Sequence, residues 1–471
     1  MPMIELYDNY IKFPDPETIR RNGKQMAFLV YITPYCSSII EYAGRTCYKS
    51  FDSIKEDSYA KFIKTIIGYG HESVIEHSNL VYIILKPNNK SKESDSDVIN
   101  RYLINLMMYN GLINVSENQA FYTISGNLRM FKDLIREYQF VRGINNKYNQ
   151  ILEDIKNSFY RLPEYFFEDM IKDGSMDIKK FNKDELFKEA TTSLNFKMLN
   201  GYVTVLNHDN FSFKVRGFLT TTNGVSTVKH LNISNYTLKK HNRMTVVIEA
   251  PRYITHQLVR HRLASYSQSS QRYVRSDSVN VYIPESFKDH HADVIASNHF
   301  NNTHNIYNSL IELGINKEDA RAVLTNAEMS TVVMTATIEE FEHFIKLRAD
   351  KAAQNFIRDM IATPIKEYLE AYYRRVEDGK GTSPYKENYV KKGMRKPNKY
   401  ERQQEAKKNC VVSNGKNKYV NKNSKPKNNK SSEAPKNSNN KKPVNKMNTK
   451  FNNKKFKPNK LNTGNPNFRY K

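Results

Sequence analysis

The sequence has no tryptophan and few cysteines. Cys36, Cys47 and Cys410 form no CxxC pair, so neither a disulfide framework nor a structural zinc site is expected, and a reducing compartment fits best. No stretch approaches the roughly 18 consecutive apolar residues of a membrane span. The N-terminal residues also lack a basic segment followed by an apolar run. We therefore expect a soluble, cytoplasmic or otherwise intracellular protein without a membrane partner.

Glycine-rich phosphate loops are absent as well. No GxGxxG motif follows a strand pattern, and no GxxxxGK[ST] motif occurs. Such loops hold phosphates in Rossmann and P-loop folds, so a nucleotide bound by this chain would be held in another manner. A catalytic thiol is not indicated either, because Cys36 and Cys47 lie far in sequence from any His-rich motif.

The positive charge is concentrated at one end of the chain. Residues 391–471 contain 25 Lys and Arg against three Asp and Glu, which is +22 of the net charge of +25. The remainder is nearly neutral at +3. From about residue 388 onward, Lys, Asn, Ser and Pro dominate, and this composition buries too little apolar surface to offset chain entropy. We predict a disordered basic tail over 388–471, which could bind nucleic acid through its lysines.

Hydrophobic patterns predict both helices and strands. Helical spacing is typical of five segments, namely 37–50, 57–70, 303–314, 318–334 and 337–375. The short β-rich runs at 80–85 and 244–251 predict strands. Thr337, with Glu340 three residues later, forms a capping box that would start the last helix. The sequence shows no internal repeat.

The segment 86–242 lies between the two predicted strands. It opens with the polar stretch KPNNKSKESDSD and continues through mixed segments such as FYTISGNLRMFKDLIREYQF. It has too many apolar and aromatic residues for a linker. We predict an insertion with a structure of its own.

The stretch HESVIEH at 71–77 contains two histidines. A zinc-protease pattern needs two histidines four apart on one helical face, whereas His71 and His77 are six apart. The pattern favours a helix start with a capping His or Ser and a buried contact between a glutamate and a histidine. We expect no metal site.

Residues 260–273, RHRLASYSQSSQRY, combine a cationic triplet with four serines. Guanidinium groups offer planar paired donors to phosphate oxygens, and hydroxyls and backbone N–H groups can satisfy the remaining oxygens. The segment could therefore hold a nucleotide. Basic segments with serines also occur on solvated surfaces, at phosphorylation sites and at nucleic-acid contacts, so the residues alone leave these alternatives open.

A longer window resembles a known family. Arg260, His261 and Arg262, followed by seven residues and Ser270, form an RHRx7S pattern within THQLVRHRLASYSQSSQRYV, which resembles the flavin-dependent thymidylate synthases. Further segments resemble that family in the same order, namely GRTCYKS at 44–50, GHESVIEH at 70–77, EDARAVL at 318–324 and FIKLRADKAAQ at 344–354. The resemblance covers about 1–85 and 243–375.

The resemblance implies a fold and an activity. The fold would be α+β, a helix-flanked mixed or antiparallel sheet, with a discontinuous catalytic domain of residues 1–85 and 243–387 around the insertion 86–242. The activity would be that of an FAD-dependent methyltransferase, which converts dUMP to dTMP with methylenetetrahydrofolate as carbon donor and NADPH as hydride donor. A homotetramer with shared active sites is also implied.

The resemblance further implies roles for single residues. The implied dUMP contacts are Gln257, Leu258, Val259, Arg260, Gln268, Ser269, Ser270, Gln271, Arg272, Arg321 and Arg348. The implied FAD contacts are His71, Ser73, Glu76, Arg260, His261, Arg262, Gln268 and His343. Arg348 would be catalytic, because a guanidinium near N3 of the pyrimidine would stabilise an anion there and raise the electron density at C5. Arg272 would reach a neighbouring subunit's site.

One departure from the family pattern concerns the flavin. The family commonly has Asn-x-Arg near the start of the long helix, where residues 337–339 here read Thr-Ile-Glu. One hypothesis is that Asn-Leu-Arg at 127–129 supplies the missing contact through Arg129. Two alternatives stay open, a family member with altered substrate or lost activity and a catalytically altered synthase-like protein whose basic tail binds nucleic acid. The presence together of Arg260, Ser270, Arg272, Arg321 and Arg348 favours an active synthase.

Overall fold

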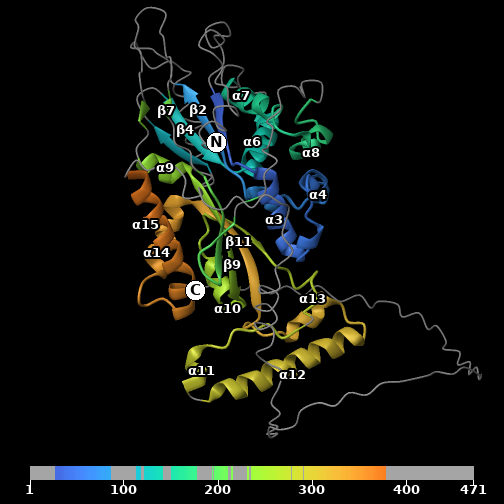
Figure 1. Cartoon of the computed structure of the whole chain (residues 1–471). Coiled ribbons are helices and arrows are strands. Elements are labelled where there is room, and N and C mark those ends of the chain that lie inside the picture. Colours follow the sequence, from blue (N-terminus) through green and yellow to red (C-terminus); the bar gives the residue numbers. More distant parts are fainter. Residues whose placement is uncertain are drawn as a thin grey trace, which may run out of the picture. The chain divides into compact units, whose positions relative to one another are not determined.

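In the computed structural model, the described part of the chain forms two main antiparallel sheets with helices beside them. The described residues are 27–85, 113–117, 121–141, 150–177, 194, 196–209, 214–215, 231–232, 235–276, 278–289 and 291–377. The predicted basic tail and Cys410 lie outside these residues. The mixture of helices and antiparallel strands confirms the predicted α+β class (Figure 1).

The smaller sheet has four strands, each antiparallel to its neighbour. Across the sheet they run β1 (Ala27–Ile32), β2 (Leu80–Leu85), β4 (Phe121–Gly126) and β3 (Asn114–Glu117). The alternating side chains of β2 are all buried from Leu80 to Ile84, so this strand packs on both faces of the sheet. The strand predicted at 80–85 is therefore confirmed.

The larger sheet has five strands, again all antiparallel. They run β10 (Ala264–Gln268), β11 (Met329–Thr337), β9 (Arg243–Pro251), β6 (Val203–His208) and β5 (Lys197–Met198). A separate pair consists of β7 (Lys214–Val215) and β8 (Leu231–Asn232). The strand predicted at 244–251 is confirmed as β9.

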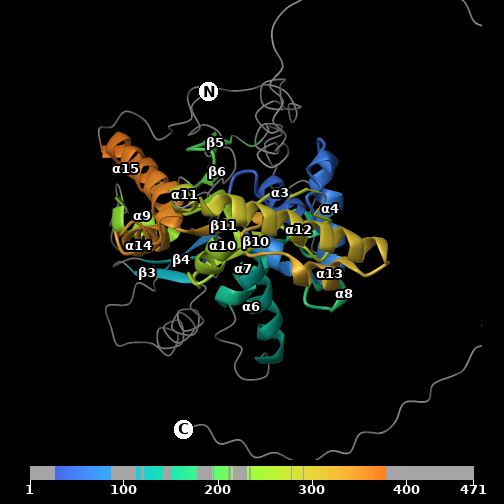
Figure 2. The same cartoon turned by 90° about the horizontal axis from the view of Figure 1, so that it is seen from below.

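The helices pack beside the sheets. Those preceding β9 are α3 (Cys36–Tyr48), α4 (Ser58–Gly68), α6 (Leu128–Val141), α7 (Gln150–Phe159), α8 (Glu168–Lys172) and α9 (Asn235–His241). Those following it are α10 (Arg252–Leu258), α11 (Glu285–Asp289), α12 (Ala292–Glu312), α13 (Lys317–Ala320), α14 (Ile338–Arg348) and α15 (Thr363–Glu377). Short 3-10 turns are η1 (Phe51–Ser53), η2 (Glu72–Glu76), η4 (Glu164–Phe166) and η7 (Arg321–Val323), and η8 (Phe356–Ala362) is π-helical. In Figure 1, α12 runs crosswise beyond the lower ends of β9 and β11, and in Figure 2, seen from below, it lies in front of them.

Each sheet has its own hydrophobic core. Helices α4, α6 and α7 bury Ile63, Phe131 and Ile155 against the smaller sheet, whereas Phe341 and Ile361 pack on the larger one. Fully burying one such side chain contributes about 1.5–3 kcal/mol. These cores fix the strands whose ends carry the candidate site.

The first helices agree with the sequence predictions. The segments 37–50 and 57–70 form α3 and α4, and 303–314 belongs to α12, which ends before Gly314 at φ +84°. A close approach explains Gly44 in α3, because a Cβ there would lie 2.5 Å from the Phe62 ring on α4. A side chain at that position would push the two helices apart.

The helical prediction for 318–334 is wrong over much of its length. Helix α13 ends at Ala320, and Met329–Thr337 is strand β11. This strand lies between β9 and β10 and is paired on both edges. Its Thr, Val and Val at 331–333 suit a pleated, buried surface, so pairing within the sheet overrides the helical spacing.

The helix predicted over 337–375 is interrupted. Thr337 caps α14 by accepting a hydrogen bond from the Glu340 N–H at 3.2 Å, as predicted. That helix ends at Arg348, however, and the chain becomes helical again only at η8. Helix η8 runs directly into α15 at Thr363, so Pro364 lies within a continuous helix, and the Met360 carbonyl that its missing N–H would have bound accepts from Asn200 Nδ2 at 2.8 Å. The break places Arg348 at a helix C-terminus.

The described parts of 86–242 contribute strands to both sheets. Strands β3 and β4 belong to the smaller sheet, and β5 and β6 to the larger one. This segment is thus built into the same sheets as its flanking segments, and the domain boundaries drawn from the sequence stay a prediction. No helix in the described ranges is long and apolar enough to cross a membrane.

Candidate functional site

The cationic triplet lies in the turn between α10 and β10. Pro251 precedes α10 in an extended conformation and ends β9, so the helix begins where the strand stops. His261 is buried, whereas Arg260 and Arg262 on either side are exposed. The turn is held by the Tyr266 hydroxyl, which donates to the His261 carbonyl at 3.1 Å. The triplet therefore presents two guanidinium groups to solvent and one imidazole to the interior.

His261 and Arg348 meet at the centre of the candidate site. Arg348 Nε donates to His261 Nε2 at 3.2 Å, and Arg348 Nη2 donates to the Gln257 carbonyl at 3.4 Å. Because Nε2 accepts, the ring proton lies on Nδ1, which faces Glu340 Oε1 at 3.6 Å. His343 lies beside this group, with its ring centroid 6.2 Å from that of His261.

A surface pocket lies at the other end of β10. It is a small hollow, open to solvent, and is lined by Ser269, Ser270 and Gln271 together with Lys49, Arg252, Val274, Arg275, Ser276, Glu328 and Met329. Arg252 Nη2 donates to the Ser269 carbonyl at 3.0 Å. Its buried Nε has no hydrogen-bond partner among the described residues. A pocket with three cationic side chains and three serines suits a phosphate group.

Glu328 gives this pocket a titratable acid. Burial raises the pKa of its carboxyl from 4.5 to about 7, against the lowering effects of Ser276, Arg252 and Lys49. The carboxyl is therefore largely protonated below neutral pH. A protonated Glu328 carries no negative charge, so it no longer offsets the positive charges of Lys49, Arg252 and Arg275.

Arg272 and Arg321 converge on one residue of α13. Arg272 Nε lies 3.4 Å from Glu318 Oε2, and Arg321 Nε donates to the Glu318 carbonyl at 3.0 Å. Gln268 points elsewhere, since its Nε2 donates to the hydroxyls of Thr255 and Ser330. Within the run 268–272, the first side chain therefore contacts α10 and β11, whereas the last contacts α13.

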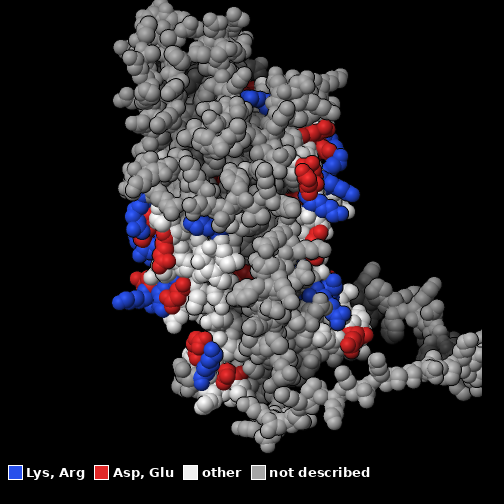
Figure 3. All heavy atoms as spheres, viewed as in Figure 1, with Lys and Arg blue, Asp and Glu red and all other residues white. Residues whose placement is uncertain are grey.

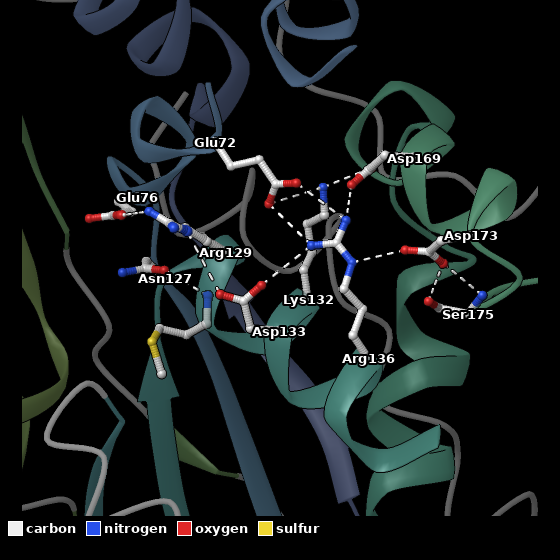
Figure 4. A network of polar contacts seen from close by, with 11 residues as sticks. Glu72, Glu76, Asn127, Arg129, Lys132, Asp133, Arg136, Asp169, Asp173 and Ser175 are labelled. Carbon is white, nitrogen blue, oxygen red and sulfur yellow. Dashed lines mark hydrogen bonds and ion pairs between the residues drawn. The ribbon is translucent and has the colours of Figure 1, made fainter. Parts of the chain in front are cut away.

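The turn 71–77 does not form the predicted contact between a glutamate and a histidine. Glu76 instead accepts a hydrogen bond from Arg129 Nη1 at 2.6 Å (Figure 4). His71 Nδ1 lies 3.2 Å from the Tyr48 hydroxyl. His71 and Ser73 are exposed. The prediction failed because the partner of Glu76 comes from a segment more than 50 residues later in the chain.

A charge network extends from this turn into α6 and α8 (Figure 4). Arg136 pairs with Glu72 at 3.2 Å and also with Asp169. Lys132, which is fully buried, lies 2.8 Å from Asp169 and 3.8 Å from Glu72. Burial lowers the pKa of the Lys132 ammonium, and its carboxylate neighbours oppose that effect. The network fixes the turn against the helix that begins with Leu128.

The structure brings some predicted residues together and leaves others apart. Gln257, His261, His343 and Arg348 form one group, and Leu258, whose carbonyl accepts from the His261 N–H at 3.0 Å, belongs to it. Ser269, Ser270 and Gln271 line the pocket. Among the described residues, no hydrogen bond joins His71, Ser73 or Glu76 to the first group. Val259 caps the end of α10 and is half-buried.

Sequence reasoning missed three cations of the pocket. Lys49 follows α3 in a left-handed conformation at φ 49°, and Arg252 and Arg275 flank the RHRx7S segment. Lys49 lies within GRTCYKS, one of the segments that resemble the family, so this resemblance could have indicated Lys49 as a candidate site residue. The Ser270 N–H donates to the Cys47 carbonyl at 3.0 Å, which brings α3 to the pocket.

The described residues give no indication of a catalytic thiol or of a metal site. Burial raises the pKa of the Cys47 thiol, which makes it a poor nucleophile. The described residues contain no group of three or more His, Cys, Asp and Glu that could hold a metal ion. Figure 3 shows basic and acidic side chains interspersed over the described surface on this face.

Comparison with known proteins identifies relatives over part of the chain. A flavin-dependent thymidylate synthase of Pyrococcus furiosus is 37% identical over 141 residues, covering 28% of this chain and 56% of that protein. One of Saccharolobus solfataricus is 27% identical over 194 residues, covering 41% of this chain and 62% of that protein. The chain thus spans only about half the length of the curated relatives it matches. A crystal structure of a UMP/dUMP methylase PolB from Streptomyces cacaoi with 5-Br dUMP is 27% identical, covering 28% of this chain and 68% of that one at a TM-score of 0.26, which is too low to support an argument.

A family model covers far more of the chain. The model described as thymidylate synthase complementing protein matches residues 28–86 and 168–372. These two ranges make up more than half of the sequence and contain β2, the RHRx7S segment and Arg348. The chain therefore belongs to the thymidylate synthase complementing protein family, that of the flavin-dependent thymidylate synthases which its RHRx7S segment resembles.

Proposed function

We propose that the protein is a flavin-dependent thymidylate synthase, which methylates dUMP to dTMP with methylenetetrahydrofolate as carbon donor and NADPH as hydride donor. The observation that carries the proposal is the contact of Arg348 with His261 beside Gln257. A guanidinium at a helix C-terminus, held by an imidazole and a carbonyl, is an oriented and permanently charged group. Such a group can stabilise negative charge on a pyrimidine ring.

The nucleotide's phosphate would lie in the pocket beyond β10. Lys49, Arg252 and Arg275 supply positive charge there, and the Ser269 and Ser270 hydroxyls supply further donors. The unpartnered Arg252 Nε supports this role, because a buried donor costs free energy until a ligand accepts its hydrogen bond. Arg272 and Arg321, which meet at Glu318, would contact the nucleotide or the neighbouring subunit's site.

The residues present fit a flavin dinucleotide. Arg260 and Arg262 are exposed and have no ion-pair partner among the described residues, so they are available for a diphosphate. His343, Gln268 and the turn with His71, Ser73 and Glu76 would complete the contacts. The flavin, when bound, supplies hydride transfer. The protein's residues bind it and orient it against the nucleotide.

We further infer a homotetramer with shared active sites. The predicted flavin turn and the group around Arg348 share no hydrogen bond within the described residues, which fits sites that other subunits complete. The alternative, a catalytically altered protein whose tail binds nucleic acid, has its support in the composition of 388–471, which lies outside the described residues.

An absorbance experiment tests the proposed function. The purified protein is examined for bound flavin, and the visible flavin band is followed anaerobically after addition of NADPH, with and without dUMP. We expect bound FAD that bleaches faster when dUMP is present. A colourless protein that takes up no added FAD would contradict the proposal and favour the alternative.

A further inference from the structure

The two sheets share one plan. The smaller sheet has the order β3-β4-β2-β1, and the larger one has β10-β11-β9-β6 followed by the short edge strand β5. In each sheet the two central strands are antiparallel neighbours, and the second of them in the chain leads directly into a helix, α6 or α14 (Figure 1). The fold therefore contains an internal repeat that the sequence does not show.

The registers of the two sheets coincide. The strand beside β2 and the strand beside β9 have an irregularity at the same place, between Leu29 and Tyr31 in β1 and between Val205 and Asn207 in β6. With β2 aligned on β9 and β4 on β11, the pairings of the remaining strands also agree position by position. A shared bulge and shared registers show that the likeness extends beyond strand order.

The helices that follow are capped in the same way. Asn127 Oδ1 accepts a hydrogen bond from the Met130 N–H at 2.9 Å, and Thr337 Oγ1 accepts one from the Glu340 N–H at 3.2 Å. Asn127 directly follows β4, and Thr337 is the last residue of β11. This correspondence aligns the Asn-Leu-Arg at 127–129 with the Thr-Ile-Glu at 337–339, without reference to any other protein.

We call the smaller sheet with α6 the first repeat, and β6, β9, β10 and β11 with α14 the second repeat. A buried histidine of the first repeat contacts the second repeat. His77 stands three residues before β2, and its Nδ1 lies 2.8 Å from Thr335 Oγ1 on β11. Its Nε2 lies 2.9 Å from Ser267 Oγ on β10. One ring therefore bridges two strands of the larger sheet.

A histidine of the second repeat makes the equivalent contacts with the first repeat. His241 stands three residues before Met244 as His77 does before Leu80, and its Nδ1 lies 2.7 Å from Ser125 Oγ on β4. Its Nε2 lies 2.8 Å from Ser116 Oγ on β3. Each ring nitrogen thus meets the hydroxyl at the equivalent position of the other repeat.

Both rings are suited to a fixed, uncharged contact. Burial lowers the pKa of each ring to about 3, so at neutral pH one nitrogen donates and the other accepts. Hydroxyl groups can rotate to suit either arrangement. We refer to His77 with Thr335 and Ser267 as the first latch, and to the equivalent contacts of His241 as the second latch.

The two latches join parts of the chain that differ in function. His77 directly follows the turn 72–76, which carries Ser73 and Glu76 of the predicted flavin contacts. Its partner Ser267 directly precedes Gln268, where the second run of predicted nucleotide contacts, 268–272, begins. The second latch joins α9 to β3 and β4, and none of these three elements carries a predicted ligand contact among the described residues. The hypothetical flavin contact Arg129 lies beyond β4, on α6, so Ser116 on β3 is the partner of the second latch that is further from it in the chain.

We propose that His77 is a positioning residue that sets the flavin turn 71–77 against the nucleotide strand β10, while its twin His241 serves only to hold the two repeats together. The proposal rests on the proposed function. It follows because the same geometry occurs twice in one chain, and only one copy connects predicted ligand-binding segments. A small displacement of one segment relative to the other lowers the affinity for a ligand that contacts both.

Matched variants test the proposal in the full-length protein. His77→Phe and His241→Phe each remove two equivalent hydrogen bonds from a buried ring, so we expect similar falls in melting temperature. FAD and dUMP affinities are measured by fluorescence titration. We expect His77→Phe to weaken FAD binding about tenfold, because its loss displaces the turn, and His241→Phe to leave it unchanged. His77→Gln, which keeps a donor and an acceptor, should recover part of the affinity.

Milder variants cover the case in which a phenylalanine variant does not fold. Ser267→Ala and Ser116→Ala each remove one partner of the equivalent ring nitrogen, and only the former should weaken FAD binding. Equal effects of the paired variants on ligand affinity, or no effect of the first-latch variants in folded protein, would overturn the positioning role. If the unaltered protein binds neither FAD nor dUMP, the proposed function itself fails, and the positioning role fails with it.

Discussion

Arg129 and Glu76 form a 2.6 Å ion pair between the start of α6 and the turn 71–77. The two residues are 53 positions apart, and the pair places a guanidinium beside a predicted flavin contact. The Arg129 side chain is still 42% exposed, so it can contact a ligand without leaving Glu76. This arrangement supports the hypothesis that Arg129 supplies the contact missing at 337–339.

Arg129→Ala tests that hypothesis. We expect about tenfold weaker FAD binding in a fluorescence titration, because one charged hydrogen bond contributes about 1.5–3 kcal/mol. Lys288→Ala is the control, since it removes one positive charge from an exposed pair with Glu285. If Arg129→Ala leaves flavin affinity unchanged, the hypothesis fails.

Arg348→Lys tests the catalytic role of the guanidinium. The substitution keeps the charge but loses the planar group that donates to both His261 and the Gln257 carbonyl. We expect kcat for dTMP formation to fall about 100-fold while bound flavin is retained. Arg358→Lys serves as the control, because that guanidinium pairs with its neighbour Asp359. A variant with unaltered kcat would exclude Arg348 from catalysis.

Glu328 should make ligand binding depend on pH. Its folded pKa of about 7 lies above its ordinary 4.5, so the folded protein keeps a proton that the unfolded chain releases. The stability linked to this proton is fully present below about pH 4.5 and is lost as pH rises to about 7, with a total on the order of 3 kcal/mol. Binding of dUMP should weaken over the upper part of this range, because the ionised carboxyl neutralises the cations of the pocket.

Glu328→Gln removes this titration. Urea unfolding and dUMP titration at several pH values should both become flatter between about pH 4.5 and 7. The exposed Glu285→Gln is the control and should leave both profiles unaltered. A wild-type profile in the Glu328→Gln variant would show that another group titrates.

Lys132→Met tests the charge network of Figure 4. The substitution removes a fully buried ammonium and leaves the carboxylates of Asp169 and Glu72 with less positive charge. We expect urea unfolding to show a loss of about 3 kcal/mol, typical of a broken buried pair. The exposed Lys64→Met should have no measurable effect. Equal stabilities of the two variants would argue against the network.

Deletion of residues 391–471 tests nucleic-acid binding by the basic tail. These residues hold most of the net positive charge. We expect the shortened protein to elute earlier from a DNA column at low salt, because fewer phosphates are neutralised. Unaltered retention would remove this function from consideration, and the flavin spectrum should be the same in both forms.

Local patterns in the sequence determined a substantial part of the molecule. The spacing of apolar residues indicated α3, α4, β2 and β9, and the Thr337 cap was readable because its chemistry lies within four residues. The residues around the RHRx7S segment were sufficient to indicate the family. These features depend on neighbours in the chain.

Tertiary structure decided what depends on distant partners. Strand β11 has helical spacing, but its backbone groups are satisfied on both edges by β9 and β10. The pairing of Glu76 with Arg129 and the contacts of His77 with β10 and β11 join segments that are 50 to more than 250 residues apart. The internal repeat stayed hidden for a related reason. Many side chains fit the same strand register, so two repeats can keep their pairings and buried hydroxyls while their sequences diverge.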